Sequence, residues 1–501
     1  MGVDAGDPGA AQASLGARTL RGTAWAYGSY IGGQLVVLVS TAILARLLTP
    51  EDFGLIALAL VFIVLLDTIS DLGLSPALVI STEKELRERA DTVFGSTIVL
   101  GLALGALTAA LAPLAAAFFD QSELAPLLAV LGLTFVLRAV GATHYALAQK
   151  RLDFRARTAA EVTGVCARGA VGIALALAGF GAWSLVLGYL AGTAALTATL
   201  WLLVPWRPSG PPRRAQLRGM LRFGSTLTAV DVLAAVISQI DYVFVGRVLG
   251  ASALGLYSLG FRLPEMLVIS LAVVAGRVLF PAFAAVDRDD LAGAFLVSVR
   301  YSAIVSLPLA FGLAVLAEPL VVTLFGEGWE GSVDCMRVLS LYALAVAIGI
   351  PAGIAYKATG QAGVLLKLAV PRTALVIGSI ALFVDDGIVA VAGCQAAVAG
   401  LFAVIGLTIA SRMLAVRPGE LASALLPPTA AAAAMGLVAF AVSSALDAPW
   451  AALVAGVAAA IPTYFGGLWV LAPDVIRDLR RRVAHAVAAS PGAGTTVGSP
   501  R

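Results

Sequence analysis

Long apolar segments, separated by short polar turns, follow one another along nearly the whole chain. Runs of about 20 apolar residues are long enough to cross a lipid bilayer as helices. When Pro, Gly and charge clusters are taken as the ends of these runs, the pattern predicts an all-α membrane protein with about fourteen spanning helices. The predicted helices are 23–47, 53–80, 92–118, 124–148, 158–178, 182–204, 223–248, 254–282, 292–317, 334–357, 364–384, 387–412, 425–446 and 450–471.

The stretch 44–79 shows the unit that the chain repeats. One apolar segment ends at a polar turn, where Thr49 and Asp52 offer capping oxygens and Pro50 has a fixed φ, so we expect a new helix to begin at once. The second segment carries Asp67 and Asp71, which are four residues apart and would share one helical face. A carboxylate at that depth in a membrane is costly, so we expect both to face a partner or a water-filled cavity.

The same turn recurs in the second half of the chain. The segment ARLLTPEDFGLIAL (45–58) aligns with GRVLGASALGLYSL (246–259), which pairs Arg46 with Arg247 and Gly54 with Gly255. Six predicted helices precede the second copy, so the two repeats are expected to be parallel. The predicted domains are a cytoplasmic N-terminus (1–22), an N-lobe (23–205), a cytoplasmic linker (206–222), a C-lobe (223–412), two further helices (425–471) and a partly disordered cytoplasmic tail (473–501).

The distribution of charge predicts how the helices are oriented in the membrane. Only 13% of the residues are charged, against about 25% in soluble proteins. Most Lys and Arg residues fall in alternate loops, which the positive-inside rule assigns to the cytoplasm. These basic groups lie within 18–21, 84–89, 150–157, 207–222, 288, 357–367, 412–417 and 477–501. Both termini are therefore predicted to be cytoplasmic.

The chain lacks the residues that several classes of enzyme require. No G-x-x-x-x-G-K-[ST] motif is present, so we expect no P-loop ATP hydrolysis. The two histidines, His144 and His485, are in no metal-binding or nucleophile pattern. No predicted loop is long enough for a soluble catalytic domain. We expect a protein that is not an enzyme and needs no cofactor or metal.

Charged residues inside the predicted helices are the candidates for function. Arg138, Arg168 and Asp67 are placed near the middle of the bilayer by helical rise. One interpretation is a cationic cavity that binds a phosphorylated substrate, because guanidinium groups bind phosphate with two parallel hydrogen bonds. The other is structural: Glu161 and Arg168 share a helical face, and either could pair with Arg138 on the neighbouring helix.

A second candidate lies in the second repeat. Arg262 and Glu265 are one turn apart beside Pro264, which removes a backbone hydrogen bond and can let the helix bend. Asp241 on the preceding helix offers Arg262 another carboxylate. The pair could bind substrate, with the carboxylates holding Arg262 when no substrate is present, or it could be a structural pair beside the kink.

Five motifs are distinctive in their order and spacing: LARLLTPEDFGLIALALVF (44–62), SDLGLSPALV (70–79), ALAQKRLDFRARTAAE (146–161), GFGAWSLVLG (179–188) and QIDYVFVGRVLGASALGLYSLGFRLPEM (239–266). Together they resemble the motifs of polysaccharide flippases of the Wzx/WzxC type, in the multidrug/oligosaccharidyl-lipid/polysaccharide exporter superfamily. The resemblance implies two six-helix bundles plus two C-terminal helices. It also implies that an undecaprenyl-pyrophosphate-linked oligosaccharide, the repeat unit of a polysaccharide or exopolysaccharide, crosses the cytoplasmic membrane by alternating access.

The partners implied by the resemblance are this lipid-linked oligosaccharide, the membrane lipids, a polysaccharide polymerase and glycosyltransferases, with no nucleic acid. A cation-coupled multidrug antiporter of the same superfamily is the alternative, with Asp67 and Asp71 as ion carriers. A membrane polymerase or ligase of glycans is a third alternative, which the lack of a large outer loop disfavours.

The predicted orientation can be tested by labelling single cysteines from outside the cell. Cysteines at Asp120, Asp385 and Asp447 are expected to react with an impermeant maleimide, since these positions lie in acidic loops assigned to the outside. Cysteines at Arg214 and Arg480 are expected to react only after the cells are permeabilised. Labelling at Arg214 in intact cells contradicts the arrangement.

Overall fold

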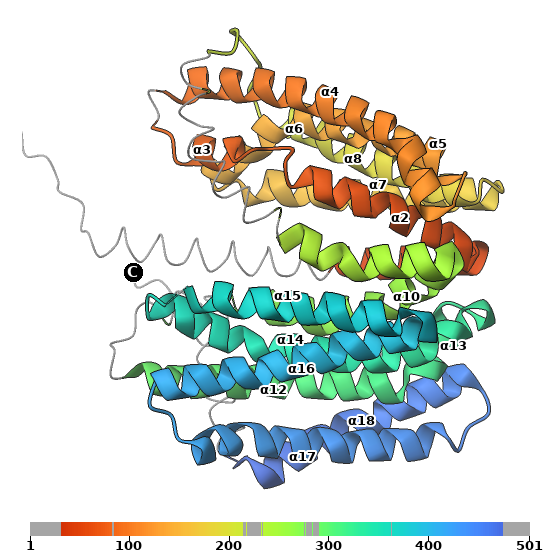
Figure 1. The fold of residues 1–501 in the computed structure, drawn as a ribbon, viewed down its shortest axis with the longest axis vertical. Coiled ribbons are helices and arrows are strands. Elements are labelled where there is room, and N and C mark those ends of the chain that lie inside the picture. The colour runs from red at the N-terminus through yellow and green to blue at the C-terminus, as the bar shows by residue number, and fades with distance from the viewer. Residues whose placement is uncertain are drawn as a thin grey trace, which may run out of the picture. The chain divides into compact units, whose positions relative to one another are not determined.

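The computed structural model describes a protein built from helices (Figure 1). It describes residues 32–82, 85–213, 217, 232, 234–274, 276, 283, 290–361 and 363–473. Within these ranges no strand occurs, and eleven helical stretches are long and apolar enough to cross a membrane. The predicted class, an all-α multi-pass membrane protein, is confirmed. The predicted N-terminus 1–22, much of the predicted linker and nearly all of the predicted tail lie outside the described residues.

The helices agree closely with the apolar runs of the sequence. In the first half, the helix Gly32–Leu47 is followed by α2 (Pro50–Asp67), α3 (Leu74–Val79), α4 (Leu86–Phe119), α5 (Leu124–Leu131), α6 (Leu133–Lys150), α7 (Phe154–Leu177) and α8 (Ala182–Leu203). The second half contains η1 (Val245–Leu249), α10 (Gly250–Pro264), η2 (Glu265–Ile269), α12 (Leu291–Val315), α13 (Ala317–Leu324), η4 (Glu327–Ser332), α14 (Val333–Ala358), α15 (Gly363–Phe383), η5 (Val384–Asp386), α16 (Ile388–Met413), α17 (Pro418–Ser443) and α18 (Pro449–Leu471).

The chain divides into two compact units. Unit 1 consists of Met1–Leu259, Leu324–Gly331 and Ile377–Val391, and unit 2 consists of Gly260–Thr323, Ser332–Val376 and Ala392–Arg501. In unit 1, α7 packs along α8 and α4 packs along α6, as the orange to yellow ribbons of Figure 1 show. In unit 2, α12 packs against α14 and α17, and α17 pairs with α18.

The second predicted helix, 53–80, is not continuous. It begins as expected, because the Thr49 hydroxyl accepts from the backbone N–H of Asp52 and the Asp52 carboxylate accepts from that of Thr49. It ends at Asp67, however, and the chain resumes as α3 after a turn in which Leu72 and Gly73 have positive φ. The Asp71 carboxylate explains the restart, since it accepts from the backbone N–H of Ser75 at 3.0 Å and from its hydroxyl at 2.7 Å.

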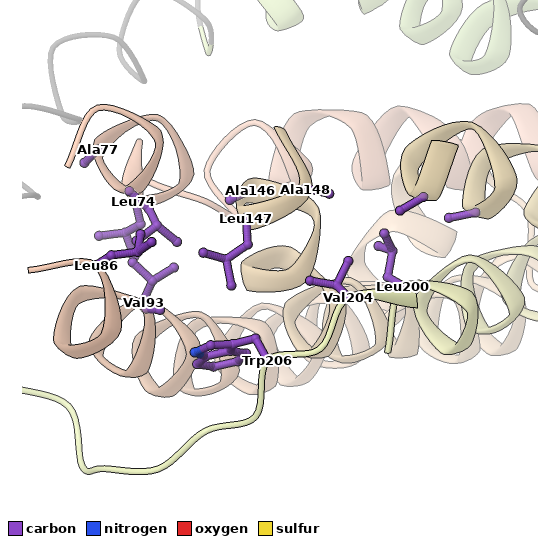
Figure 2. Close-up of a cluster of buried hydrophobic side chains, with 14 residues drawn as sticks. Leu74, Ala77, Leu86, Val93, Ala146, Leu147, Ala148, Leu200, Val204 and Trp206 are labelled. Carbon is purple, nitrogen blue, oxygen red and sulfur yellow. The ribbon is translucent and has the colours of Figure 1, made fainter. Parts of the chain in front are cut away.

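Two sets of contacts hold the short helix α3 in place. Its Leu74 and Ala77 belong to a buried apolar cluster with Leu86 and Val93 of α4 (Figure 2). At its far end, the Lys150 ammonium donates to the carbonyls of Val79 and Ser81, at 3.1 and 2.5 Å. A cation near the C-terminal carbonyls of a helix is favourable because those groups lack helical partners.

The two copies of the repeated turn meet within unit 1. A Cβ added at Gly54 would overlap the carbonyl of Ala251, and a Cβ added at Gly255 would overlap the carbonyl of Pro50. Each glycine of the aligned pair thus allows the other copy's backbone to approach closely. The beginnings of α2 and α10 are therefore in direct backbone contact.

Trp329 packs against the beginning of α2 in the same unit. Trp329 is buried, its indole N–H donates to the carbonyl of Ala45 at 2.7 Å, and its ring lies 5.0 Å from that of Phe53, edge to face. Arg46 Nε donates to the carbonyl of Leu324 at 3.1 Å. The segment Leu324–Gly331 thus satisfies a carbonyl that the end of the helix Gly32–Leu47 leaves without a helical partner.

Replacing Gly54 tests this contact. Gly54→Ala is expected to lower the free energy of unfolding by about 1–3 kcal/mol, because the new methyl group forces two backbones apart. Gly393→Ala in α16 is the matched control, since a Cβ there meets nothing within 4 Å and alanine favours a helix by about 0.5–1 kcal/mol. Thermal unfolding of the purified protein in detergent measures both. Equal effects of the two substitutions would contradict the close packing.

Candidate substrate site in unit 1

Four side chains from four helices of unit 1 form one polar cluster. Asp67 is the last residue of α2, Arg138 lies within α6, Arg168 within α7 and Tyr189 within α8. We call these four residues the deep cluster. It contains three of the residues that sequence analysis proposed for function, together with a tyrosine that it did not.

Arg138 links the cluster. Its Nη1 forms an ion pair with Oδ2 of Asp67, and its Nη2 donates to the Tyr189 hydroxyl at 2.8 Å. Both arginines also lie near the aromatic ring of Tyr189. The guanidinium carbon of Arg168 lies 4.5 Å from the centre of the ring, and that of Arg138 lies 6.0 Å from it. A guanidinium over a tyrosine ring is attracted by the ring's negative face. Tyr189 therefore holds two arginines at once.

Glycines on α8 make this geometry possible. A Cβ on Gly192 would lie 2.8 Å from Cβ of Arg168, and a Cβ on Gly188 would lie 2.9 Å from its carbonyl oxygen. Gly188 and Gly192 lie on the face of α8 that packs against α7, and Tyr189 lies between them in the sequence. Because they carry no side chain, α7 approaches α8 closely enough for Arg168 to reach the Tyr189 ring. A tyrosine within an otherwise apolar helix, flanked by glycines one residue before and three after it, is the sequence signal that points to this position.

The cluster has more positive than negative charge. Two guanidinium groups face a single carboxylate among its four members, and the side chains of Arg138 and Asp67 are 38% and 36% exposed. Arg168 is also exposed. Accessible guanidinium groups of this kind can accept an anion with paired hydrogen bonds. The arrangement is suited to binding phosphate, and Asp67 is the counter-ion that such a ligand would have to displace.

The alternative in which Glu161 pairs with Arg138 does not occur in the structure. Glu161 instead accepts a hydrogen bond from the Tyr145 hydroxyl at 3.0 Å, and Arg138 pairs with Asp67. Spacing along one helix shows which residues share a face, but it does not show which helix lies opposite. Here α2 supplies the carboxylate.

Asp67 and Asp71 also differ from expectation. They do not share a helical face, because α2 ends at Asp67 and Asp71 belongs to the turn before α3. Asp67 pairs with Arg138 and accepts from the Ser70 hydroxyl at 3.3 Å, whereas Asp71 accepts from Ser75. The two carboxylates therefore have different partners. Their role in ion coupling stays a prediction.

The second candidate is divided between the units. In unit 2, Arg262 Nη1 and Glu265 Oε2 lie 4.0 Å apart, with side chains that are 41% and 48% exposed, and the π-helical η2 begins directly after Pro264. In unit 1, Asp241 is buried and accepts from the Tyr257 hydroxyl at 2.8 Å. The structure thus brings Arg262 and Glu265 together beside an irregular backbone. Binding of substrate by these residues also stays a prediction.

Among the residues that the structure describes, no group of three or more His, Cys, Asp or Glu side chains could hold a metal ion. The deep cluster owes its positive charge to arginines, whose guanidinium groups stay protonated and therefore neither release protons nor bind metal ions.

Comparison with known proteins identifies relatives over most of the chain. Residues 43–334 match a family described as polysaccharide biosynthesis proteins. The succinoglycan biosynthesis transport protein ExoT of Rhizobium meliloti is 30% identical over 75% of this chain and 76% of its own length. The lipopolysaccharide biosynthesis protein WzxC of Escherichia coli is 29% identical over 73% of this chain and 75% of its own.

Solved structures share the fold. The lipid II flippase MurJ, in an inward closed conformation, superimposes with a TM-score of 0.73 at 15% identity, covering 90% of this chain and 99% of its own. An inward-facing multidrug transporter of the MATE family gives a TM-score of 0.63 at 18% identity, covering 76% and 94%. These similarities confirm the fold predicted from the sequence.

The pairing of Asp67 with Arg138 can be measured by a double-mutant cycle. Asp67→Asn leaves Arg138 without its carboxylate and is expected to lower thermal stability, because an unpaired charge inside a membrane protein is costly. Arg138→Gln in the same chain is expected to restore part of the loss, with a coupling of about 1 kcal/mol for this partly exposed pair. Effects that simply add would show that the two side chains do not interact.

Proposed function

The chain belongs to the family of polysaccharide biosynthesis proteins, and we propose that it is a transporter that flips an undecaprenyl-diphosphate-linked oligosaccharide across the cytoplasmic membrane. Relatives named for succinoglycan transport and for lipopolysaccharide biosynthesis support a saccharide substrate. The protein is not an enzyme: transport of this kind moves the substrate without making or breaking a covalent bond.

The deep cluster is the observation that carries the proposal. A lipid diphosphate has several negative oxygens, and Arg138 and Arg168 offer two guanidinium groups, both in contact with Tyr189. Asp67 forms an ion pair with Arg138. Displacement of Asp67 by substrate would change the contacts between α2 and α6. Binding that differs between two arrangements of a protein is what a two-state transporter requires.

The alternative, a cation-coupled drug antiporter, has less support from the same geometry. A carboxylate binds a proton or a sodium ion less readily when a cationic side chain is already paired with it. Asp67 is paired with Arg138, which stays positively charged, and Asp71 is bonded to the beginning of α3. The MATE transporter shares the fold at 18% identity, which bears on architecture alone.

The remaining sequence predictions complete the proposal. With both termini in the cytoplasm, the substrate would be loaded from the cytoplasmic side and released outside by alternating access. Glycosyltransferases would make the lipid-linked unit and a polymerase would consume it. Arg262 and Glu265 would supply a second contact in unit 2, with Asp241 held by Tyr257.

Flipping by purified protein in liposomes tests the function. The wild-type protein is expected to move a fluorescent undecaprenyl-diphosphate oligosaccharide between leaflets. Arg168→Gln is expected to slow the movement about tenfold or more, the loss expected for one charged hydrogen-bonding group. Arg168→Lys is expected to restore it in part, because an ammonium keeps the charge but loses the planar contact.

Arg151→Gln serves as the control, because Arg151 is exposed at the end of α6 and its change removes the same charge outside the cluster. Normal flipping by Arg168→Gln would contradict the assignment of the deep cluster. Transport of cationic drugs, with no flipping of the lipid, would favour the antiporter.

A further inference from the structure

A second cluster of the same construction lies nearer the predicted inner end of α6 and α7. Arg157 Nη2 donates to the Tyr145 hydroxyl at 2.7 Å, and the guanidinium carbon of Arg157 lies 4.7 Å from the centre of the Tyr145 ring. The Tyr145 hydroxyl donates in turn to Glu161 at 3.0 Å. We call these three residues the inner cluster. As in the deep cluster, an arginine lies on a tyrosine ring with a carboxylate beside it.

Local folding places the inner cluster close to the helix ends. The Asp153 carboxylate accepts from the backbone N–H of Ala156 at 3.0 Å and begins α7, so that Arg157 lies within its first turn. Tyr145 is five residues from the end of α6, or about 8 Å by helical rise. The positive-inside rule assigns this end of both helices to the cytoplasm.

The two clusters lie along the same helix faces. On α7, Arg157, Glu161 and Arg168 fall four and seven residues apart in succession, which keeps all three on one face. On α6, Tyr145 and Arg138 are seven residues apart and also share a face. The rise from Arg157 to Arg168 is about 16 Å. The inner and deep clusters therefore lie on the same faces of α6 and α7, one nearer the helix ends than the other.

The inner cluster has bonding capacity to spare. Arg157 Nε is buried and has no hydrogen-bond partner. Oε1 of Glu161 lies 3.9 Å from Nη2 of Arg157, and the Glu161 side chain is 53% exposed. The ion pair between them is therefore loose. A guanidinium with an unused donor, next to a carboxylate that can swing into solvent, is able to exchange that carboxylate for another anion.

We propose that the inner cluster is a capture subsite for a lipid-borne phosphate, where the substrate's diphosphate binds before it moves along α6 and α7 to the deep cluster. The inference rests on the proposed function. Arg157 supplies the charge, Tyr145 orients its guanidinium, and Glu161 is the resting partner that the phosphate displaces. The deep cluster offers the diphosphate two guanidinium groups, those of Arg138 and Arg168, whereas the inner cluster offers one, so the deep cluster binds it with more hydrogen bonds.

The concentration dependence of flipping separates capture from the later steps. Arg157→Gln is expected to raise the apparent KM for undecaprenyl diphosphate by about tenfold, the loss of one charged hydrogen bond, while the maximal rate stays within about twofold. Arg155→Gln is the matched control, because Arg155 is exposed on the same turn of α7 and faces away from the cluster. A variant that is merely misfolded would lose maximal rate instead.

Glu161→Gln gives an independent test that does not remove a positive charge. If Glu161 competes with phosphate for Arg157, this change is expected to lower the apparent KM about two- to threefold. Arg157→Lys is expected to fall between wild type and Arg157→Gln. An unchanged KM in both Arg157→Gln and Glu161→Gln would overturn the subsite.

Ordinary anionic lipids carry phosphate too, and competition distinguishes the two sources. Added undecaprenyl diphosphate is expected to compete with the fluorescent substrate for the site and so to slow its flipping. Phosphatidylglycerol, added to the same liposomes at the same concentrations, is expected not to compete. Competition by phosphatidylglycerol at equal concentration would overturn capture of the substrate at this place. If the wild-type protein flips no lipid diphosphate at all, the proposed function fails; normal flipping with an unaffected Arg157→Gln variant refutes the subsite alone.

Discussion

The ion pair between Asp67 and Arg138 is the interaction on which the candidate site depends. It joins the last residue of α2 to Arg138 in the first half of α6. An unpaired charge inside a membrane protein is costly, so each side chain depends on the other. Arg138 then reaches Tyr189, whose ring also holds Arg168, so one carboxylate indirectly positions residues from three further helices. The same pair marks where α2 ends, and the chain turns through Asp71 into α3. Local backbone geometry and the charge of the site are therefore set together.

Most of the fold could be predicted from the apolar runs, because a span of helix in lipid must bond its own backbone and cover it with apolar side chains. The capping box at Thr49 and Asp52 was equally visible. The break after Asp67 was not predicted, although Thr68, Ser70, Asp71, Gly73 and Pro76 interrupt the apolar run there. It depends on Asp71 bonding to Ser75 and on the positive φ of Gly73, which apolar periodicity does not reveal.

The candidate site could be predicted in part. Depth and the cost of buried charge singled out Asp67, Arg138 and Arg168, all of which meet in the structure. Their partners could not be assigned, because spacing shows which residues share a face of one helix but leaves open which helices are neighbours. Tyr189 was missed for that reason: it reaches Arg168 only because Gly188 and Gly192 let α7 pack closely against α8. Arg157, first placed among surface basic residues, gains significance from Tyr145 for the same reason.

Transport by the deep cluster requires that a lipid diphosphate take the place of Asp67 on Arg138 and also bind Arg168. A cryo-electron microscopy structure of the protein in lipid nanodiscs, with bound undecaprenyl-diphosphate oligosaccharide, tests it directly. Phosphate oxygens are expected within hydrogen-bonding distance of both Arg138 and Arg168, with the ion pair between Asp67 and Arg138 broken. A diphosphate bound elsewhere, with that ion pair intact, would contradict it.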